Sequence, residues 1–511
     1  MKNIKLLFWA VLLFTFLSCD KDLPTQYNFK GYEFASTDPD GGTWVPVLIN
    51  SADEISIPAP EDVSSASYQQ ELADLKTAME QMTDDEKKAV TFWTQNPIIR
   101  WNEIALELIA KYNLIPGPDP DGTYPAPDPN NPAGPPPFPF AHPPYAVRAL
   151  AYMSVAQFDG LISAWYYKYQ YNRSAPFIQD ESIEPKYVDN ITLSYPSDGA
   201  VIARASREIL TKMFPLEADY LEEQEAEHLR SLLLSGANVE SDISAGVMIG
   251  DAISEIALNR AATDGMDKAG ASKAISDSLA AEALNRFGWQ WINQEIPQRP
   301  IGLVPLYSRV KMWSVENVED TRPIPPPAIG SPEYEADVKI LKNYADNVTE
   351  ETRRIANFWQ DGLGTYTPPG HWNDIAIRYI IQYRMNPLRT ARTFAYMNMA
   401  MMDGGISCWD AKYYYHYPRP IQTIKGFKTI AGTPNFPSYT SGHSVFSAAA
   451  AEVLSYVFPD EAATFKGWAE EAAISRVYGG IHWTYDAFIG TDQGIDVASY
   501  TITKAQNDGA D

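Results

Sequence analysis

The feature that most constrains the fold of this chain is an internal repeat. Between Ala151 and Lys168 the residues Ala-Tyr-Met, Asp-Gly, Ile-Ser, Trp and Lys stand in an order that recurs between Ala395 and Lys412. The separation is 244 residues, and it stays constant over about 100 residues, which predicts two copies of one folding unit. The first copy is assigned to residues 44–265 and the second to residues 313–511, with residues 266–312 as the connector between them.

A proline-rich stretch interrupts the match upstream. Trp101 and Asn102 pair with Trp372 and Asn373 at a separation of 271, so the first copy holds 27 additional residues. They fall in segment 115–144, which is too rich in proline for a helix and too long for an ordinary connection. A surface loop is favoured over a lid or rim above a site.

Helical periodicity dominates both copies, whereas the alternation of Val, Ile and Thr that is typical of strands is scarce. The sequence therefore predicts an all-α fold of two tandem helical bundles related by internal duplication, the second carrying the active site. Apolar residues at spacings of three, four and seven indicate helices at 68–92, 203–234, 251–285, 334–359, 374–385, 390–411, 444–457 and 461–478.

The amino-terminal residues have the pattern of a bacterial export signal. A basic start precedes an apolar run from Leu6 to Leu17, and about 12 apolar residues are too few to span a bilayer. We expect residues 1–18 to be a lipoprotein signal peptide, Cys19 to carry the lipid and 19–43 to be a tether. The protein would be secreted across the inner membrane and reside in the periplasm or outer membrane, held only by its lipid anchor.

Net charge and cysteine content exclude several classes of protein. The formal net charge of −25 argues against nucleic acid and anionic membrane surfaces as partners. With Cys19 lipidated, Cys408 has no partner, so no disulfide framework is expected. Because hydrophobic residues make up 45% of the chain, a large core is expected to stabilise it instead.

Three clusters of basic and hydroxylic residues lie in the second copy, between Trp409 and Asp486. Their spacings are Lys-x6-Arg-Pro, Ser-Gly-His and Ser-Arg-x5-His-x3-Asp. Cations that cluster in an acidic chain indicate a local anion. The residues that form the candidate site are Lys412, Arg419, Ser441, Gly442, His443, Arg476, His482 and Asp486.

Together these residues supply the donors for a tetrahedral oxyanion such as phosphate or vanadate. Arginine presents planar forks and lysine a point charge, while Gly442 allows close approach to the backbone. Two histidines indicate two roles, His482 as nucleophile or metal ligand and His443 as general acid or base. Asp486 follows His482 by one helical turn and would orient its ring.

In order and spacing, the three clusters resemble the signature shared by type 2 phosphatidic acid phosphatases, bacterial acid phosphatases and vanadium-dependent haloperoxidases. Thr440 stands where that signature usually has proline, outside the residues that contact the oxyanion. The resemblance implies an enzyme in which His482 is the metal ligand of a haloperoxidase or the nucleophile of a phosphatase. It also implies two bundles of helices, and catalytic residues at His443, His482, Lys412, Arg419, Arg476 and Asp486.

The first copy has lost this set and is expected to carry a degenerate site. Lys168 and Ser197 remain at the repeat positions, but an acidic residue has entered that would repel an oxyanion. We therefore expect one active site per chain. The replacements for Arg419, Gly442, His443, Arg476 and His482 are Ala175, Asp198, Gly199, Leu232 and Asn238.

Residues flanking the signature are similar to the vanadium chloroperoxidase-like branch. Trp409 and Phe436 stand at the positions of halide-pocket aromatics in that branch, which implies a vanadate-dependent haloperoxidase that oxidises halide with hydrogen peroxide to hypohalous acid. Trp165 stands at the equivalent position of the first copy, which has lost the site. Packing in the core is therefore as good an interpretation of Trp409 as a role in the halide pocket. His371 and His416 also lie near the clusters in sequence and are interpreted as structural.

Two alternatives remain. An acid phosphatase would hydrolyse phosphomonoesters or lipid phosphates through a phosphohistidine at His482 and would need no cofactor, whereas a haloperoxidase would hold vanadate where phosphate can also bind. A non-catalytic oxyanion-binding lipoprotein is less favoured, because binding alone does not require His443. The expected partners are small molecules, either peroxide with halide or a phosphoester, and the sequence leaves the oligomeric state open.

Overall fold

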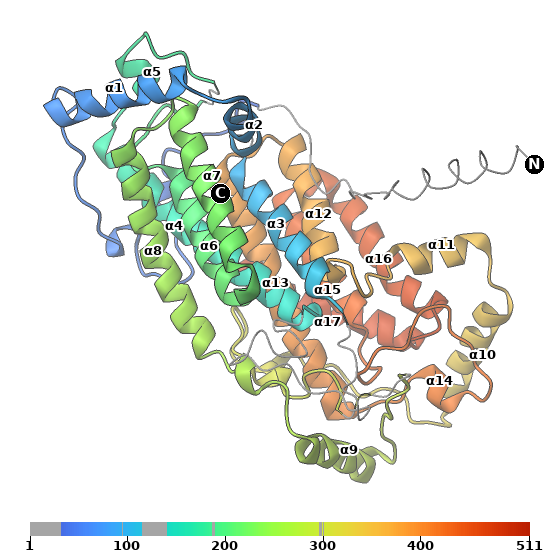
Figure 1. The fold of residues 1–511 in the computed structure, drawn as a ribbon. Helices are drawn as coiled ribbons and strands as arrows, with labels where there is room; N and C mark the ends of the chain where they lie inside the picture. The colour runs from blue at the N-terminus through green and yellow to red at the C-terminus, as the bar shows by residue number, and fades with distance from the viewer. Residues whose placement is uncertain are drawn as a thin grey trace, which may run out of the picture. The chain divides into compact units, whose positions relative to one another are not determined.

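Two helices of equal length, α4 (Pro143–Tyr171) and α13 (Pro387–Tyr415), pack against each other in the computed structural model (Figure 1). Each has 29 residues and begins with proline at its first turn, where the missing amide hydrogen has no helical partner to lose. Both are buried along most of their length. The structure describes residues 32–94, 96–114, 141–186, 190–295, 299 and 301–510, which belong to one compact unit, Gly31–Asp511.

The described residues form helices and no strand, apart from one isolated bridge between Ser174 and Leu193. The prediction of an all-α fold is confirmed. The first copy adds α1 (Ala66–Glu80), α2 (Asp84–Trp93), α3 (Pro97–Tyr112), α5 (Pro176–Gln179), α6 (Asp198–Met213), α7 (Ala218–Leu234) and α8 (Glu240–Ala262). After α9 (Lys273–Phe287), the second copy adds α10 (Pro332–Asp346), α11 (Glu350–Phe358), α12 (Thr367–Gln382), α14 (Pro420–Thr423), α15 (Gly442–Val457), α16 (Ala462–Tyr478) and α17 (Thr484–Ala505).

The helices of the two copies recur in the same order and with matching lengths. α6 and α15 both have 16 residues, and α7 and α16 both have 17. Each of these pairs begins 244 residues apart, as do α4 and α13. This recurrence supports the interpretation of the chain as two copies of one unit.

Equivalent residues of the two copies meet in the core. The side-chain amide of Asn398 donates to the Ser154 hydroxyl at 3.1 Å, and these residues are 244 apart. Asn102 donates to Asn373 at 2.9 Å, and these are 271 apart, the separation found upstream in the sequence. A position that contacts its own equivalent lies on a local two-fold axis, so the copies face each other across α4, α13, α3 and α12.

Several predicted helices are divided in the structure. The predicted helix 68–92 is interrupted at Thr83, which caps the start of α2 and is contacted in return by Glu86. Thr349 caps α11 within the predicted helix 334–359, and Ser272 caps α9 within the predicted helix 251–285. The side chain of a capping residue accepts hydrogen bonds from the first amide groups of its helix. In a continuous helix, the carbonyls of the preceding turn would accept them instead. The sequence pattern also missed α3, α4 and α17.

Close packing between α15 and α17 brings the second and third clusters together. An added Cβ would lie 3.1 Å from the Ser441 carbonyl oxygen at Gly490 and 2.5 Å from the Val445 carbonyl oxygen at Gly494, so glycines let the α17 backbone approach α15 closely. α13 packs against both helices. The amino ends of α15 and α17 and the carboxyl end of α13 thereby surround one point.

Some predictions concern residues that the structure does not describe. The signal peptide 1–18, the lipidation site Cys19 and most of the proline-rich segment lie outside the described residues. Among the residues that are described, no helix has the length and apolar character needed to cross a membrane.

Candidate active site

The three sequence clusters converge at one buried site in the second copy. Lys412 lies in the last turn of α13, Arg419 directly before α14, and Ser441, Gly442 and His443 at the start of α15. The third cluster spans the end of α16 and the start of α17. It contributes Arg476, His482 and Asp486.

His482 is held in one tautomer by its two neighbours. Its Nδ1 lies 2.9 Å from Oδ2 of Asp486, and its Nε2 lies 3.1 Å from Nη1 of Arg419. A guanidinium only donates, so Nε2 must accept and Nδ1 must carry the proton. Burial, followed by Arg419 and Lys412, lowers the pKa of His482 well below its ordinary value. The neutral ring therefore directs the lone pair of Nε2 toward the cations of the site.

Asp486 links the third cluster to the second. Its Oδ2 also accepts from the Ser438 hydroxyl and, at 3.2 Å, from the Trp483 amide. Its peptide oxygen accepts from the Ser441 amide at 2.9 Å. Burial raises the pKa of Asp486, while the hydrogen bond from Ser438 and the charge of Lys412 oppose that shift. The sequence did not single out Ser438, which lies outside all three clusters.

The ammonium group of Lys412 is fully buried among peptide oxygens. It donates to the carbonyls of Pro437 and Ser438 at 3.1 and 3.0 Å and also to that of Thr440. Burial, with Arg419 nearby, lowers the pKa of Lys412. Three carbonyls use the three donors of the ammonium, so an anion would have to share or replace one of these contacts.

Both arginines of the signature are also buried. Arg419 donates to the carbonyls of Phe436 at 3.1 Å and Ile481 at 2.7 Å. Arg476 donates through Nη2 to the Ala356 carbonyl at 2.6 Å and through Nε to Ser475 at 2.8 Å. Burial lowers the pKa of each guanidinium to about 10. Both remain charged at neutral pH, because that value lies far above it.

These three buried cations lack a carboxylate partner. Within the part of the chain that the structure describes, neither Lys412 nor Arg419 nor Arg476 forms an ion pair. Two carboxylates act on them from beyond ion-pair distance, Asp486 on Lys412 and Arg419 and Asp361 on Arg476. Burying cations without counter-charge is costly. The residues therefore fit a multiply charged oxyanion, which would supply the missing negative charge.

The first turn of α15 adds neutral donors. Ser441 caps the helix by accepting from the Ser444 amide, and helix amino ends attract anions through unsatisfied amides. An added Cβ at Gly442 would lie 3.8 Å from its nearest neighbours, Phe446 and Trp409. Such a Cβ would make only ordinary contacts, so packing does not require glycine there.

His443 is partly exposed, unlike His482. Its Nε2 lies 3.3 Å from the Gln360 carbonyl oxygen. Desolvation by the surrounding protein, followed by the charge of Arg476, lowers the pKa of His443 well below its ordinary value. A neutral imidazole at the open side of the site suits proton transfer to or from a small substrate.

The predicted halide-pocket aromatics lie against the cations. The rings of Trp409 and Phe436 are 5.0 Å apart, and Phe436 lies 4.9 Å from Nζ of Lys412. The Trp409 indole donates to the Leu303 carbonyl at 3.0 Å. Trp165 makes the matching contact with the Thr37 carbonyl at 3.1 Å in the first copy. This recurring contact supports a structural role for Trp409, although its ring also borders Gly442.

The equivalent region of the first copy is filled by its own residues. Lys168 pairs with Asp198 at 3.0 Å, so its charge is neutralised internally. An added Cβ at Gly199 would lie 2.5 Å from Leu232, which occupies the space that a histidine would need. The Asn238 carbonyl accepts from Ser197 at 3.1 Å. Arg173, a second buried cation of this region, pairs with Asp242, so both cations are neutralised internally and neither is left for an oxyanion.

The remaining predicted histidines have structural partners. His416 ends α13 and accepts from the Trp291 amide at 3.0 Å, and burial lowers its pKa to about 4. His371 lies 3.0 Å from Asp361 through Nδ1 and stacks on Trp359 with ring centroids 4.6 Å apart. Sequence reasoning gave Asp361 no role. No motif pointed to it, because its contacts depend on the turn after α11.

Comparison with known proteins agrees with this arrangement. Residues 393–509, which contain all three clusters, match the model of the PAP2 superfamily. The second copy carries a PAP2 superfamily domain. The superfamily predicted from the clusters is confirmed.

The chain also resembles a curated protein and several solved structures. Vanadium chloroperoxidase of Curvularia inaequalis is 21% identical over 30% of this chain, and the chain spans only 40% of that relative's length. A bacterial vanadium-dependent iodoperoxidase matches 71% of this chain and 91% of its own, with 24% identity and a TM-score of 0.53. A holo-type bacterial vanadium-dependent chloroperoxidase matches 77% and 98%, with 15% identity and a TM-score of 0.51. At these identities the structures establish a shared fold.

Proposed function

We propose that the chain is a vanadate-dependent haloperoxidase that oxidises halide with hydrogen peroxide to hypohalous acid. The observation that carries this proposal is the burial of Lys412, Arg419 and Arg476 without a carboxylate partner, around a neutral histidine whose Nε2 lone pair faces them. The reaction consumes one peroxide, one halide and one proton, and it releases hypohalous acid and water. The relatives in the comparisons carry haloperoxidase names, which supports the same choice.

The donor set suggests how vanadate would be held. Nε2 of His482 would bind vanadium in place of its hydrogen bond from Arg419, because it is the unprotonated nitrogen of a buried ring. The oxygens would receive hydrogen bonds and charge from Lys412, Arg419, Ser441, the Gly442 amide and Arg476. Vanadate, when bound, would activate hydrogen peroxide toward attack by halide.

The chain's own residues would then control protons and charge. His443, neutral at physiological pH, would take a proton from incoming peroxide and return it to the departing oxygen. Lys412 would polarise a peroxide oxygen by giving it one of the hydrogen bonds that its ammonium now donates to peptide oxygens. Phe436 covers Lys412 and Arg419, and the exclusion of water strengthens their electrostatic effect.

A phosphatase is the second candidate, and the tautomer of His482 is the observation that favours it. The same Nε2 lone pair could attack phosphorus to give a phosphohistidine, with the three cations stabilising the equatorial oxygens and His443 protonating the leaving group. Superfamily membership is compatible with both chemistries.

One experiment separates the two candidates. The full chain is incubated with orthovanadate, peroxide and bromide, with a phenol as halogen acceptor, and in parallel with a chromogenic phosphomonoester without vanadate. We expect vanadate-dependent halogenation that disappears in His482→Ala. Phosphoester cleavage that vanadate inhibits, together with no halogenation, would instead establish the phosphatase.

Binding supplies a readout that does not depend on turnover. In isothermal titration without peroxide, orthovanadate should bind wild type and should bind Arg476→Met far more weakly, because Arg476 forms no ion pair and only the longer-range charge of Asp361 opposes its burial. Equal binding by both proteins would contradict the proposed site.

We also propose export and lipidation at Cys19, on the basis of the residue pattern at 1–19. Expression of wild type and Cys19→Ala in bacteria that incorporate a labelled fatty acid tests this. Label is expected in wild type alone, and label in neither protein would refute the anchor.

A further inference from the structure

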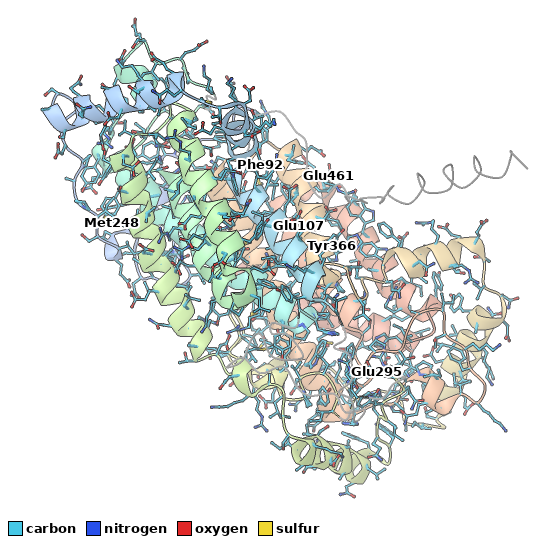
Figure 2. All side chains as sticks on the ribbon, viewed as in Figure 1. Phe92, Glu107, Met248, Glu295, Tyr366 and Glu461 are labelled. Carbon is cyan, nitrogen blue, oxygen red and sulfur yellow. The ribbon has the colours of Figure 1, made fainter. Side chains whose placement is uncertain are left out.

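The connection between α11 and α12 is longer in the second copy than its equivalent in the first. Trp359 and Trp372 stand thirteen positions apart, whereas their counterparts Trp93 and Trp101 stand eight apart. The copy that holds the oxyanion site therefore carries five extra residues at this place. The structure puts this connection, which ends at Tyr366 (labelled in Figure 2), beside His443.

Backbone carbonyls at this place contact two residues of the candidate site. The Ala356 carbonyl, near the end of α11, accepts from Nη2 of Arg476 at 2.6 Å. The Gln360 carbonyl, in the connection, lies 3.3 Å from Nε2 of His443. A carbonyl oxygen only accepts, so Nε2 of His443 must carry a proton. In the neutral ring, Nδ1 is then the nitrogen that can take a proton from substrate.

Asp361 and His371 hold this connection in place. Nδ1 of His371 lies 3.0 Å from Oδ1 of Asp361, the residue that follows Gln360. Asp361 adopts a left-handed backbone conformation with φ of 43°, which is uncommon for residues with a side chain although aspartate tolerates it. The bond to His371 fixes its side chain in this turn.

Three aromatic rings enclose the His371 ring. Trp359 stacks on it at 4.6 Å, while Phe358 and Tyr366 meet it edge-on at 5.2 and 6.2 Å. His371 itself is 7% exposed. Packed on these sides and bonded to Asp361, the imidazole is a rigid support for the turn that follows α11.

The first copy offers an internal comparison. Arg100 stands at the position of His371, 271 residues earlier. It pairs with Glu103 at 3.0 Å and donates to the Phe92 carbonyl at 3.1 Å. This copy also lacks the equivalents of His443 and Arg476. The aspartate–histidine support therefore accompanies the site and is replaced where the site is lost.

We propose that Asp361 and His371 are positioning residues that hold the Gln360 carbonyl against His443 and thereby select the tautomer of His443 with its proton on Nε2. Nδ1 of His443 is left as the proton acceptor. The tautomer is a property of the unliganded protein. Only its consequence for turnover rests on the proposed function.

Nitrogen NMR of the unliganded protein tests the tautomer directly. The chain has six histidines, so ¹⁵N-histidine labelling gives few signals, and each is assigned by its loss in a single substitution. The protonated and bare nitrogens of a neutral imidazole have well-separated shifts. We expect His443 to show a protonated Nε2 and a bare Nδ1 at pH 7, and a protonated Nδ1 would overturn the proposal.

A matched pair of variants tests the support. His371→Phe keeps a ring among the aromatics but cannot donate to Asp361, whereas His371→Asn places an amide donor near the former Nδ1. We expect His371→Phe to mix the tautomers of His443 and to lower kcat by about tenfold, part of the usual contribution of a proton-transferring group. The asparagine variant should restore most of both properties.

Other outcomes are equally decisive. If His371→Phe leaves the His443 shifts unchanged, the support is not what sets the tautomer. If that variant fails to fold by circular dichroism, Asp361→Asn replaces it, since its neutral oxygen accepts more weakly and should produce a smaller change in the same direction. An inactive wild type with the expected His443 shifts would refute the proposed function alone.

Discussion

Asp486 binds the two ends of the active site together. Its carboxylate accepts from Nδ1 of His482 at 2.9 Å, while its peptide oxygen accepts from the amide of Ser441 at 2.9 Å. One residue therefore orients the ring of the proposed metal ligand and fixes the start of α15 beside it. Sequence spacing indicated the first contact, and the second became visible only in the structure.

Removal of that carboxylate should weaken oxyanion binding. We expect Asp486→Ala to lower vanadate affinity by about 10- to 100-fold, the usual effect of losing a residue that orients a metal ligand. Isothermal titration without peroxide measures it. Asp337→Asn is the matched control, because Asp337 accepts from Thr484 at the start of α17 and contacts no residue of the three clusters. Similar losses in both variants would attribute the effect to α17 as a whole.

Trp409 and Trp165 should contribute equally to stability. Trp409→Phe removes the hydrogen bond to the Leu303 carbonyl, which keeps the Tyr413 hydroxyl as a donor at 2.9 Å. The expected loss is about 2–3 kcal/mol, of which about 1 kcal/mol is the hydrogen bond and the rest the cavity left by the smaller ring. Trp165→Phe should lose about as much, and denaturant unfolding measures both. A changed halide KM in Trp409→Phe alone would assign that ring to the halide pocket.

The first copy should bind no oxyanion. Titration of wild type is expected to give one vanadate per chain, because Asp198 neutralises Lys168 and Leu232 fills the adjacent space. Asp198→Asn should leave this ratio unchanged. It should destabilise the fold by about 2 kcal/mol, less than for a fully buried pair because Asp198 is partly exposed.

A surface ion pair serves as the control for Asp198→Asn. Lys273 and Asp277 lie 2.7 Å apart, with both side chains 63% exposed, so Asp277→Asn should produce no measurable change in stability. Two vanadates per chain in wild type would contradict the assignment of a degenerate site.

His228 should make the protein less stable in acid. It is buried against Trp93 and accepts from the Trp101 indole at 3.2 Å, and burial lowers its pKa to about 3. Below about pH 6.5 the unfolded chain binds a proton here that the folded protein excludes, so stability falls as pH falls. Between pH 7 and 5 this amounts to about 2 kcal/mol.

The His228→Asn variant isolates that contribution, because asparagine does not titrate. Urea unfolding at pH 7 and pH 5 should show a smaller loss of stability for the variant than for wild type, by the amount given above. Equal losses in both proteins would mean that His228 is protonated in the folded state.

Sequence patterns predicted the helical class and the site far better than the limits of the helices. Periodicity missed α4 and truncated α13 because these helices are buried on nearly all sides and show no single apolar stripe. The contacts of Asp361 and Ser438 were also beyond prediction. Both residues act through turns whose geometry depends on packing between distant elements.

The sequence by itself determined which groups stand within one turn of each other. The spacing from His482 to Asp486 indicated their contact, which the structure makes across the start of α17, with Asp486 in its first turn and His482 just before its cap. The repeat specified which copy retains the chemistry. Only the tertiary structure decided the charge balance and the tautomers. Arg419 and His482 are 63 residues apart, and Gln360 and His443 are 83 apart. Hydrogen bonds across such separations form only after the helices have packed, and they decide which nitrogen of each histidine carries the proton.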